Sequence, residues 1–247
     1  MIKEKLAMVV DSTSCIDCKG CMAACKVENH VPDGYWRNWI KTQEAVLNPE
    51  DSGVRVNSHF QPGNCMHCDN PTCVEACPTG ATYRNETDGT IQVNKQLCIG
   101  CGSCIPACPY GARYRHPEKK VVDKCDFCKT RRERGELPAC VITCPTKARV
   151  FGNLNDPRSE AAKLLGKGTA VRVVNAKTDT KPNIYYLGIT QPLDWPVEAY
   201  IPAPIWAWEK LAKPLVWLAV GVNALGVLTM LGKQLLLPEK DDDSGDQ

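Results

Sequence analysis

The stretch Cys98-Ile-Gly-Cys101-Gly-Ser-Cys104-Ile-Pro-Ala-Cys108-Pro109 decides the fold of this 247-residue chain. Its spacing, C-x2-C-x2-C-x3-C-P, is the one with which bacterial ferredoxins bind 4Fe-4S clusters. Three thiolates that lie close together on a tight loop can ligate three irons of one cubane, and the fourth thiolate must then come from elsewhere. The sequence therefore predicts iron–sulfur chemistry at this run.

The chain contains sixteen cysteines, and all of them fall into four quartets of related spacing. Each quartet opens with Cys-x-x-Cys and closes with Cys-x-x-x-Cys. Sixteen thiolates suffice for four 4Fe-4S clusters. The quartets are Cys15, Cys18, Cys21 and Cys25; Cys65, Cys68, Cys73 and Cys77; Cys98, Cys101, Cys104 and Cys108; and Cys125, Cys128, Cys140 and Cys144.

The order of the quartets along the chain predicts how they pair. In two-cluster ferredoxins the last cysteine of each run ligates the neighbouring cluster. The second and third quartets are adjacent and the other two flank them, which indicates two nested ferredoxin-like pairs; four self-contained quartets are the alternative. The predicted ligand sets are Cys65, Cys68, Cys73 with Cys108; Cys98, Cys101, Cys104 with Cys77; Cys15, Cys18, Cys21 with Cys144; and Cys125, Cys128, Cys140 with Cys25.

Two other uses of cysteine compete with clusters. A disulfide framework is typical of short secreted chains, and disulfide geometry does not demand four repeats of one spacing. Zinc suits isolated Cys-x-x-Cys pairs, so the last quartet would fit a zinc ribbon if it stood alone. The Cys-Pro endings of three quartets favour clusters throughout.

An internal repeat follows the last cysteine of three quartets. It reads Pro-Thr-Gly-Ala-Thr-Tyr at 78–83, Pro-Tyr-Gly-Ala-Arg-Tyr at 109–114 and Pro-Thr-Lys-Ala-Arg-Val at 145–150. Proline ends the helical turn that carries the ligand, small residues let the backbone pass close to a cubane, and a β-type segment is expected next. Cys25 lacks this element, so we expect its helix to continue.

Local patterns predict the remaining elements. Asp88-Gly89 is a hairpin turn signal between segments 81–84 and 90–93, and a second hairpin is expected within 112–123. Asp156 and Pro157 are expected to start a helix that runs to the glycines Gly166 and Gly168. Strands are expected at 6–10, 171–174 and 184–187, and a helix at 22–29.

Composition limits what else the chain can do. Only 6% of the residues are aromatic, so bound cubanes are expected to organise the first 150 residues. The net charge of +2 argues against broad nucleic-acid binding, and the basic run 129–134 is interpreted as a solvated helix face or a partner contact. His67 is interpreted as a partly exposed loop residue or as one that tunes a cluster. The sequence contains no nucleophile–base spacing, dinucleotide fingerprint or phosphate loop, so a non-catalytic role is expected.

The C-terminal region differs in composition. Residues 215–231 are uncharged, and Trp206 and Trp208 precede them as interfacial residues would. Lys233 can snorkel to the interface. A membrane anchor is therefore predicted, with a buried core helix as the alternative. The expected domains are a four-cluster domain at 1–190 (inner pair about 60–115, outer pair about 6–58 and 116–155), an extended connector at 191–213, an anchor at 214–238 and a disordered acidic tail at 239–247.

The side of the membrane is not fixed by the lysines, which flank the anchor equally. The N-terminus shows no signal peptide, which taken alone favours the cytoplasm. Co-export of the folded chain with a signal-bearing partner would instead put the iron–sulfur domain on the periplasmic face of a bacterial inner membrane. The periplasmic face is our expectation, and the cytoplasmic face stays open.

The four quartets, the Cys-x2-Cys-x11-Cys-x3-Cys-Pro form of the last one, Tyr110–Tyr114, Phe151–Asp156 and Tyr185–Leu187 together resemble one family. It comprises the four-cluster electron-transfer subunits of molybdopterin oxidoreductase complexes, among them polysulfide, tetrathionate and dimethyl sulfoxide reductases and membrane-bound formate dehydrogenase. The resemblance covers residues 6–187. The anchor departs from the simplest members and resembles formate dehydrogenase and quinone reductase complexes.

The resemblance implies an α+β fold of two nested ferredoxin-like modules followed by a transmembrane helix. It implies four 4Fe-4S clusters that relay single electrons between a large molybdopterin-family subunit and a polytopic, quinone-reacting membrane subunit. The menaquinone reductase complex of sulfate-reducing bacteria is one candidate, with a multihaem cytochrome as a further partner. A stand-alone polyferredoxin tethered to the membrane is the alternative.

Overall fold

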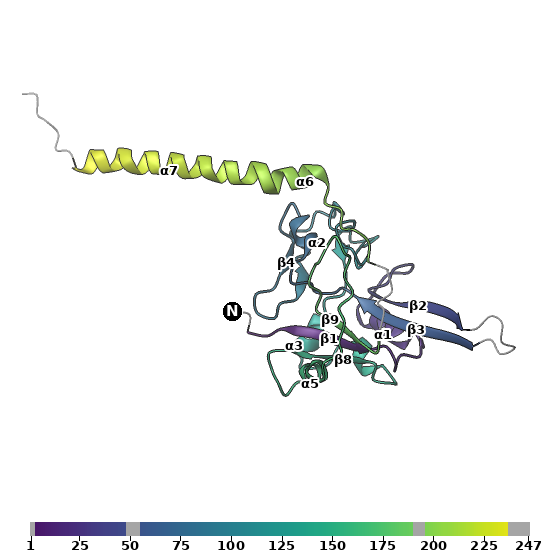
Figure 1. The fold of residues 1–247 in the computed structure, drawn as a ribbon. Coiled ribbons are helices and arrows are strands. Elements are labelled where there is room, and N and C mark those ends of the chain that lie inside the picture. Colours follow the sequence, from purple (N-terminus) through teal and green to yellow (C-terminus); the bar gives the residue numbers. More distant parts are fainter. Residues whose placement is uncertain (1–2, 48–54, 190–195, 237–247) are drawn as a thin grey trace, which may run out of the picture. The chain divides into compact units, whose positions relative to one another are not determined.

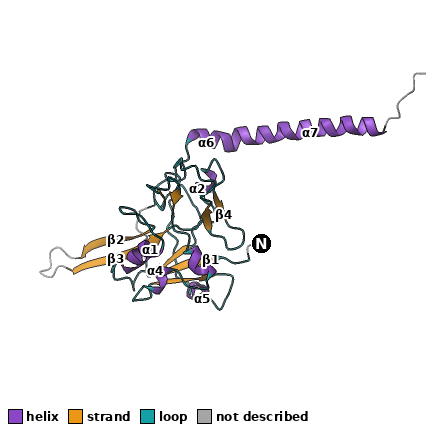
Figure 2. Cartoon of the chain, turned by 180° about the vertical axis from the view of Figure 1, so that it is seen from behind, coloured by secondary structure: helices purple, strands orange, loops and turns teal. Residues whose placement is uncertain are grey.

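The computed structural model describes residues 3–47, 55–189 and 196–236. The chain divides into two compact units, Met1–Pro202 and Ala203–Gln247. The first unit consists largely of loops with short helices and strands around them (Figures 1 and 2). The acidic tail and part of the predicted connector lie outside the described residues.

A three-stranded sheet joins the two ends of the first unit. Strand β1 (Leu6–Asp11) pairs antiparallel with β8 (Arg149–Asn153) and parallel with β9 (Ile184–Leu187). The run Leu-Ala-Met-Val-Val of β1 is buried, as its central position in the sheet requires. The strands predicted at 6–10 and 184–187 are therefore confirmed.

Two short hairpins follow closing cysteines, as the repeat predicts. The first pairs β4 (Thr82–Arg84) with β5 (Ile91–Val93), and the second pairs β6 (Tyr114–Arg115) with β7 (Val122–Asp123). The third copy of the repeat leads into β8. A β-type segment thus follows each of the three Cys-Pro endings.

A long antiparallel hairpin between the first two quartets was not predicted. Strand β2 (Asn38–Leu47) pairs along its full length with β3 (Arg55–Asn64), and the ribbon extends from the unit in Figure 1. Its residues alternate between polar and β-branched or aromatic types too irregularly to give a period-2 signal. The intervening Asn-Pro-Glu-Asp-Ser-Gly at 48–53 has the composition of a turn and could have revealed it.

Short helices carry the cysteines of three quartets. They are α1 (Gly20–Glu28), α2 (Thr72–Glu75) and α4 (Ala139–Ile142), and α3 (Lys129–Glu133) follows Cys128. Helix α1 confirms the helix predicted at 22–29. Buried cysteines of all four quartets share clusters of packed side chains with Met8, Ile91 and Phe127, so the ligand residues form much of the core.

Two sequence predictions in the scaffold were wrong. Helix α5 (Glu160–Gly166) begins after Ser159 and not at Pro157, because Asp156 accepts hydrogen bonds from Arg158 and closes a turn there. Of the strand predicted at 171–174, only Val171 pairs, with Tyr186. The carbonyl of Val173 instead accepts a hydrogen bond from the Tyr110 hydroxyl, which takes it out of strand pairing.

The second unit is one apolar helical rod made of α6 (Ala203–Ala207), the π-helical turn η1 (Trp208–Ala212) and α7 (Lys213–Leu236). Residues Ala203–Lys233 are long and apolar enough to cross a membrane, and none of this segment's apolar window is buried by its own unit. The helix thus starts inside the region predicted as an extended connector, because Pro204 stands in the first turn, where no N–H is needed. Pro214 lacks the N–H that an α-helical bond would use, which accounts for the π-turn before it.

Candidate functional site

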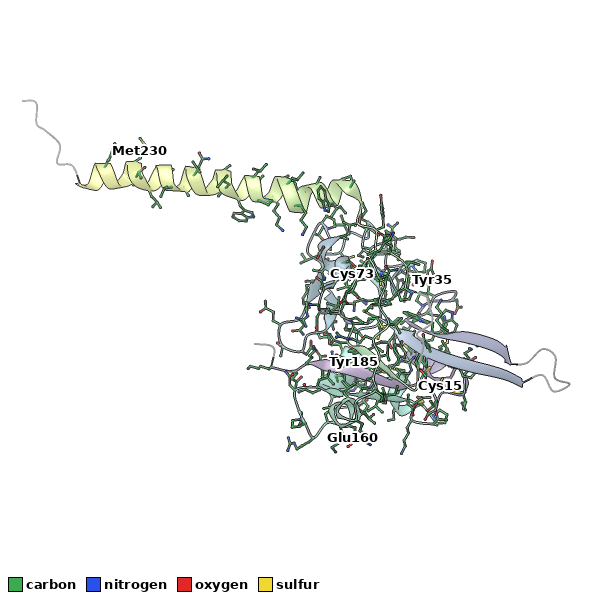
Figure 3. All side chains as sticks on the ribbon, in the orientation of Figure 1. Cys15, Tyr35, Cys73, Glu160, Tyr185 and Met230 are labelled. Atoms are coloured by element: carbon green, nitrogen blue, oxygen red, sulfur yellow. The ribbon has the colours of Figure 1, made fainter. Side chains whose placement is uncertain are left out.

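None of the sixteen cysteines forms a disulfide, and their exposure follows the predicted ligand sets. The set with Cys25 is fully buried, and the set with Cys108 has three buried members and one half-buried. Each of the other two sets contains one exposed cysteine, Cys18 in one and Cys101 in the other. The predicted sets thus divide into two interior and two peripheral groups; in Figure 3, the labelled Cys15 and Cys73 lie well apart in the first unit.

The four quartets share one unusual backbone feature. The residue before the second cysteine has a positive φ in each: 53° at Asp17, 47° at His67, 65° at Gly100 and 56° at Phe127. Left-handed turns of this kind create concave arrays of N–H groups that bind anions. At Gly100 no side chain fits, because a Cβ would lie 1.8 Å from the carbonyl oxygen of Lys120. This shared turn suits a negatively charged cubane at every quartet.

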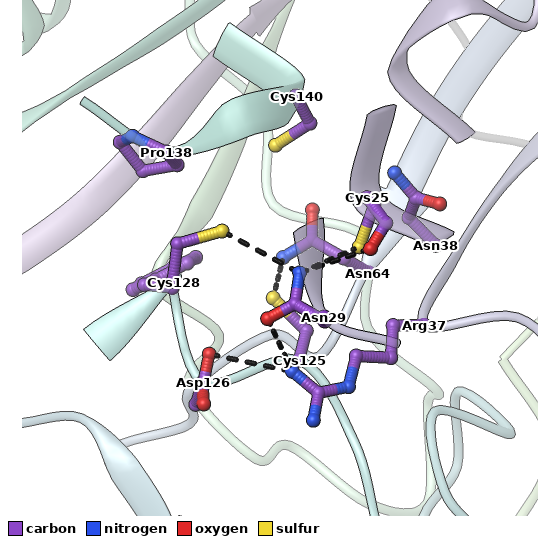
Figure 4. Close-up of a pocket in the computed structure, with 11 residues that line it drawn as sticks. Cys25, Asn29, Arg37, Asn38, Asn64, Cys125, Asp126, Cys128, Pro138 and Cys140 are labelled. Atoms are coloured by element: carbon purple, nitrogen blue, oxygen red, sulfur yellow. Dashed lines mark hydrogen bonds and ion pairs between the residues drawn. The ribbon is translucent and has the colours of Figure 1, made fainter. Parts of the chain in front are cut away.

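One of the interior sets lines a pocket directly (Figure 4). Cys125 and Cys128 come from the loop before α3, Cys140 from α4, and Cys25 from the end of α1. The structure therefore brings together the four cysteines that the nested pairing assigns to one cluster. Their assignment as its ligands stays our proposal.

Amide side chains point at the sulfurs of this pocket. The Nδ2 of Asn29 lies 3.6 Å from the Cys25 Sγ and 3.8 Å from the Cys128 Sγ, and the Nδ2 of Asn64 lies 3.5 Å from the Cys125 Sγ. Hydrogen bonds to cluster sulfurs are one of the means by which proteins set reduction potentials. Sequence reasoning missed both asparagines, since nothing in their local pattern distinguishes them from turn residues.

The chemistry of this donor set fits a cluster. Burial, followed by the nearby Cys140 and Cys128, raises the pKa of the Cys25 thiol to about 12. Burial also raises the pKa of Cys140 to about 11. Such thiols lose their protons together only when bound cations compensate the charge, and iron supplies that compensation. In the part of the chain that the structure describes, no three His, Cys, Asp or Glu side chains converge on a single metal ion; a cubane instead spaces its ligands over four irons.

In the inner pair, the exchange of closing cysteines stays a prediction, and several cysteines of the two sets lie near one another. Burial and then the nearby Cys73 raise the pKa of the Cys108 thiol to about 11. Burial also raises the pKa of the Cys104 thiol, and the nearby Cys73 and Cys77 add to that rise. Backbone N–H groups also reach sulfurs, from Thr82 to Cys77 Sγ at 3.3 Å. These proximities agree with the predicted sets around Cys108 and Cys77.

The predicted set with Cys144 lies where helix α1 packs on helix α4. A Cβ on Gly20 would lie 3.6 Å from the Cys18 Sγ and 3.9 Å from the Thr143 side chain, so the start of α1 meets the residue before Cys144. Burial, and to a smaller extent the nearby Cys21 thiol, raise the pKa of the Cys15 thiol. Closure of this set by Cys144 stays a prediction.

The two pairs meet at Asn64 and Cys65. The Asn64 amide donates to the Cys65 carbonyl at 3.0 Å as well as to the Cys125 sulfur, and Cys65 lies close enough to influence the thiol of Cys125. The two interior sets therefore adjoin each other.

His67 is buried completely, so its interpretation as a partly exposed residue was wrong. Its Nδ1 accepts a hydrogen bond from the Ile91 N–H at 3.0 Å, and its ring stacks on Phe127 with 3.7 Å between the ring centroids. Burial, and then the positive charges of Lys124 and Arg132, lower its pKa well below the usual value. A neutral His67 thus joins two cysteine loops through packing.

The basic run 129–134 is only partly a solvated face. The Arg131 Nη1 lies 3.0 Å from the Glu28 carboxylate, and the Arg132 Nη1 lies 3.1 Å from that of Asp88. Both arginine side chains are largely buried, whereas Lys129 and Arg134 are exposed. The run therefore ties α3 to α1 and to the β4–β5 turn.

The fold and the four cysteine loops define a polyferredoxin-type electron-transfer protein. Two models of a 4Fe-4S dicluster domain match the chain, at residues 56–154 and 14–81. The chain is 46% identical over 182 residues to Protein NrfC of Escherichia coli strain K12, covering 73% of this chain and 79% of that protein. It is 44% identical over 183 residues to a component of the polysulfide reductase of Wolinella succinogenes, covering 74% and 93%. It is 36% identical over 205 residues to a component of the tetrathionate reductase of Salmonella typhimurium, covering 83% and 80%.

The chain belongs to this family of 4Fe-4S dicluster electron-transfer subunits of anaerobic respiratory reductases. Its two dicluster modules and sixteen cysteines carry four 4Fe-4S clusters.

Proposed function

We propose that the chain conducts single electrons through its four clusters in a fixed order. The order is the set with Cys77, the set with Cys108, the set with Cys25 and the set with Cys144. The exposure of the cysteines carries this proposal, because the two interior sets are shielded while each terminal set has one exposed ligand. The contact of Asn64 with Cys65 and Cys125 supports a junction between the interior sets.

Each end of this order presents an apolar side chain beside an exposed cysteine. Ile16 lies between Cys15 and Cys18 and is 61% exposed, and Ile99 lies between Cys98 and Cys101 and is 66% exposed. Exposed apolar groups are common at sites where partners dock. The two isoleucines are therefore candidate contacts for an electron donor at one end and an acceptor at the other.

The last described segment of the first unit contacts the third cysteine loop. The N–H of Val197 donates to the Pro109 carbonyl at 2.8 Å, and that of Tyr200 donates to the Pro106 carbonyl at 3.1 Å. The last described part of the first unit therefore lies against the inner pair. In this proposal the set with Cys77, whose loop at 98–108 this segment contacts, exchanges electrons with the quinone-reacting partner.

The partners follow from the names of the relatives and from the apolar helix. Two of these relatives are named as parts of multi-component enzymes, a polysulfide reductase and a tetrathionate reductase. A molybdopterin-family large subunit is the partner expected at the Ile16 end, and a polytopic quinone-reacting subunit at the Ile99 end. The menaquinone reductase complex, with its multihaem cytochrome, is one assembly of this kind. We place the iron–sulfur domain on the periplasmic face of the inner membrane, through co-export with a partner.

Copurification of the tagged full-length chain in detergent tests this assignment. Ile16→Glu and Ile99→Glu should each lose a different partner and keep all iron, because each places a charge in one contact only. Val174→Glu is the matched control, since Val174 is an exposed apolar residue outside the cysteine loops. A chain that purifies with full iron and no partner would be a stand-alone tethered carrier. Loss of the same partner from both isoleucine variants would contradict the two-ended order.

A further inference from the structure

The internal repeat places a matched residue five positions after each of three closing cysteines. These residues are Thr82 after Cys77, Arg113 after Cys108 and Arg149 after Cys144. Both arginines are buried, and Arg149 ranks first among the largest fully buried side chains. Each pair of quartets therefore holds one interior arginine at an equivalent place in the chain.

Arg113 lies between the two cluster sets of the inner pair. Its Nη2 donates to the Cys73 Sγ at 3.0 Å, and its Nη1 donates to the Thr82 Oγ1 at 3.1 Å. Burial raises the pKa of the Cys104 thiol, and the charge of the nearby Arg113 partly offsets that rise. Cys73 and Cys104 belong to different proposed clusters, so one guanidinium faces both.

Arg149 has the same relation to the outer pair. Arg149 lines one pocket together with Cys144, which the nested pairing assigns to the set with Cys15. Its Nη1 donates to the Asn64 Oδ1 at 3.0 Å. Asn64 in turn contacts the Cys125 sulfur, as described above.

Both arginines have donors that are left unpaired. The Nε of Arg113 and both the Nε and Nη2 of Arg149 are buried and have no hydrogen-bond partner among the described residues. A buried cation with unpaired donors costs several kcal/mol unless an anion compensates it. No carboxylate forms an ion pair with either side chain in the described part of the chain. A 4Fe-4S cluster with four thiolate ligands is a net anion, and its sulfides can accept these hydrogen bonds.

Two other buried cations have acceptors in the protein for their donors. Arg37 is paired with Asp123, and the Nζ of Lys124 donates to the carbonyls of Ile91 and Cys125. Their contacts explain their burial without a cluster. Arg113 and Arg149 differ from both in having buried donors without an acceptor among the described residues.

We infer that Arg113 and Arg149 are the buried positive charges that compensate the negative charge of the clusters, one arginine in each module. Each arginine thereby raises the reduction potentials of both clusters in its own module. Reduction adds negative charge to a cluster, so a nearby buried guanidinium stabilises the reduced form more than the oxidised form. Because each arginine faces two clusters, it also offsets their mutual repulsion. This inference rests on the proposed ligand sets but not on the proposed partners.

Arg113→Gln and Arg149→Gln in the full-length chain test it, with potentials measured by EPR-monitored titration and iron determined per chain. At the wild-type midpoint potential, each variant should lower the reduced-to-oxidised ratio of two clusters by roughly tenfold, which corresponds to about 59 mV for a one-electron couple. The two variants should affect different pairs of clusters. Arg172→Gln is the matched control: it removes the same charge from an exposed side chain, and all four potentials should stay as they are.

Unchanged potentials in iron-replete variants, or shifts of the same clusters by both, would overturn the inference. If a glutamine variant loses iron, the corresponding lysine variant decides. Lysine keeps the charge but not the planar array of donors, so we expect full iron and any shift to be below tenfold and confined to the same pair. Loss of iron from the lysine variant as well, or a shift spread over all four clusters, would assign the arginine a packing role. A failure of the partner assignment would leave these potentials unaffected, so the two proposals fail separately.

Discussion

The ion pair between Arg37 and Asp123 should contribute strongly to the stability of the cluster domain. The Arg37 Nε lies 2.8 Å from the Asp123 Oδ2 and its Nη2 lies 2.7 Å from the Oδ1, and the two side chains are only 6% and 7% exposed. The Tyr114 hydroxyl also donates to Asp123. The Arg37 Nη1 donates to Asn29, whose amide reaches two sulfurs of the pocket in Figure 4. The pair thus connects β7 to α1 beside a cluster.

Asp123→Asn removes one charge and leaves the buried guanidinium with only the longer contact to the Asp126 carboxylate, at 3.6 Å. Breaking a buried pair in this way costs about 3–5 kcal/mol. For a domain of this size, 1 kcal/mol corresponds to a change of roughly 2–4 °C in Tm. We therefore expect Tm to fall by about 6–20 °C. The double variant Arg37→Met with Asp123→Leu should recover most of this loss, because two apolar side chains need no counter-charge.

The measurement is anaerobic thermal loss of the iron–sulfur absorbance at one heating rate, since cluster release makes the transition irreversible. Glu160→Gln is the control, because the Glu160–Lys163 pair lies exposed on α5 and surface pairs contribute little. If Asp123→Asn were as mild as this control, the pair would not stabilise the domain. A double variant no more stable than Asp123→Asn would refute the charge argument.

Three further predictions concern the clusters and the helix. Anaerobically purified protein should contain about sixteen irons per chain, and a reproducible twelve or fewer would contradict four complete cubanes. Cys144→Ser should perturb the same cluster signal as Cys15→Ser, and Cys108→Ser the same signal as Cys65→Ser; a signal shared by Cys144→Ser and Cys125→Ser would instead indicate self-contained quartets. Truncation after Pro202 should leave iron content unchanged and weaken membrane association, whereas loss of the clusters would identify the helix as part of the fold.

The cysteine loops and the hairpins after them could be predicted because their determinants are local. In the second quartet the turn before the second cysteine, the helical turn before the closing one and the proline after it all lie within the short stretch 67–78. Asp88-Gly89 specifies its hairpin in the same way. The spacing of residues along the sequence therefore predicts this part of the fold.

Features that depend on tertiary closure could not be predicted in this way. Arg132 and His67 belong to sequence patterns typical of exposed loops and helix faces, yet one pairs with Asp88 and the other packs under Phe127. Burial of a polar side chain depends on which partner reaches it across 24 or more residues, as Ile91 reaches His67. No local pattern in a single sequence indicates which distant residue will become the partner.

The repeat nevertheless contained a signal for the two interior arginines. A charged residue at a position that follows an Ala and a closing cysteine, in two of three copies, is unexpected where the backbone passes close to a cluster. In the first copy, at 78–83, Thr82 occupies that position, and it accepts a hydrogen bond from Arg113. An arginine at position 82 as well would add a second buried guanidinium without a carboxylate partner beside Arg113, which the burial cost disfavours; Arg37, the other buried arginine, is paired with Asp123. One arginine for each pair of clusters is the arrangement that this cost favours, and the sequence of the repeat follows it.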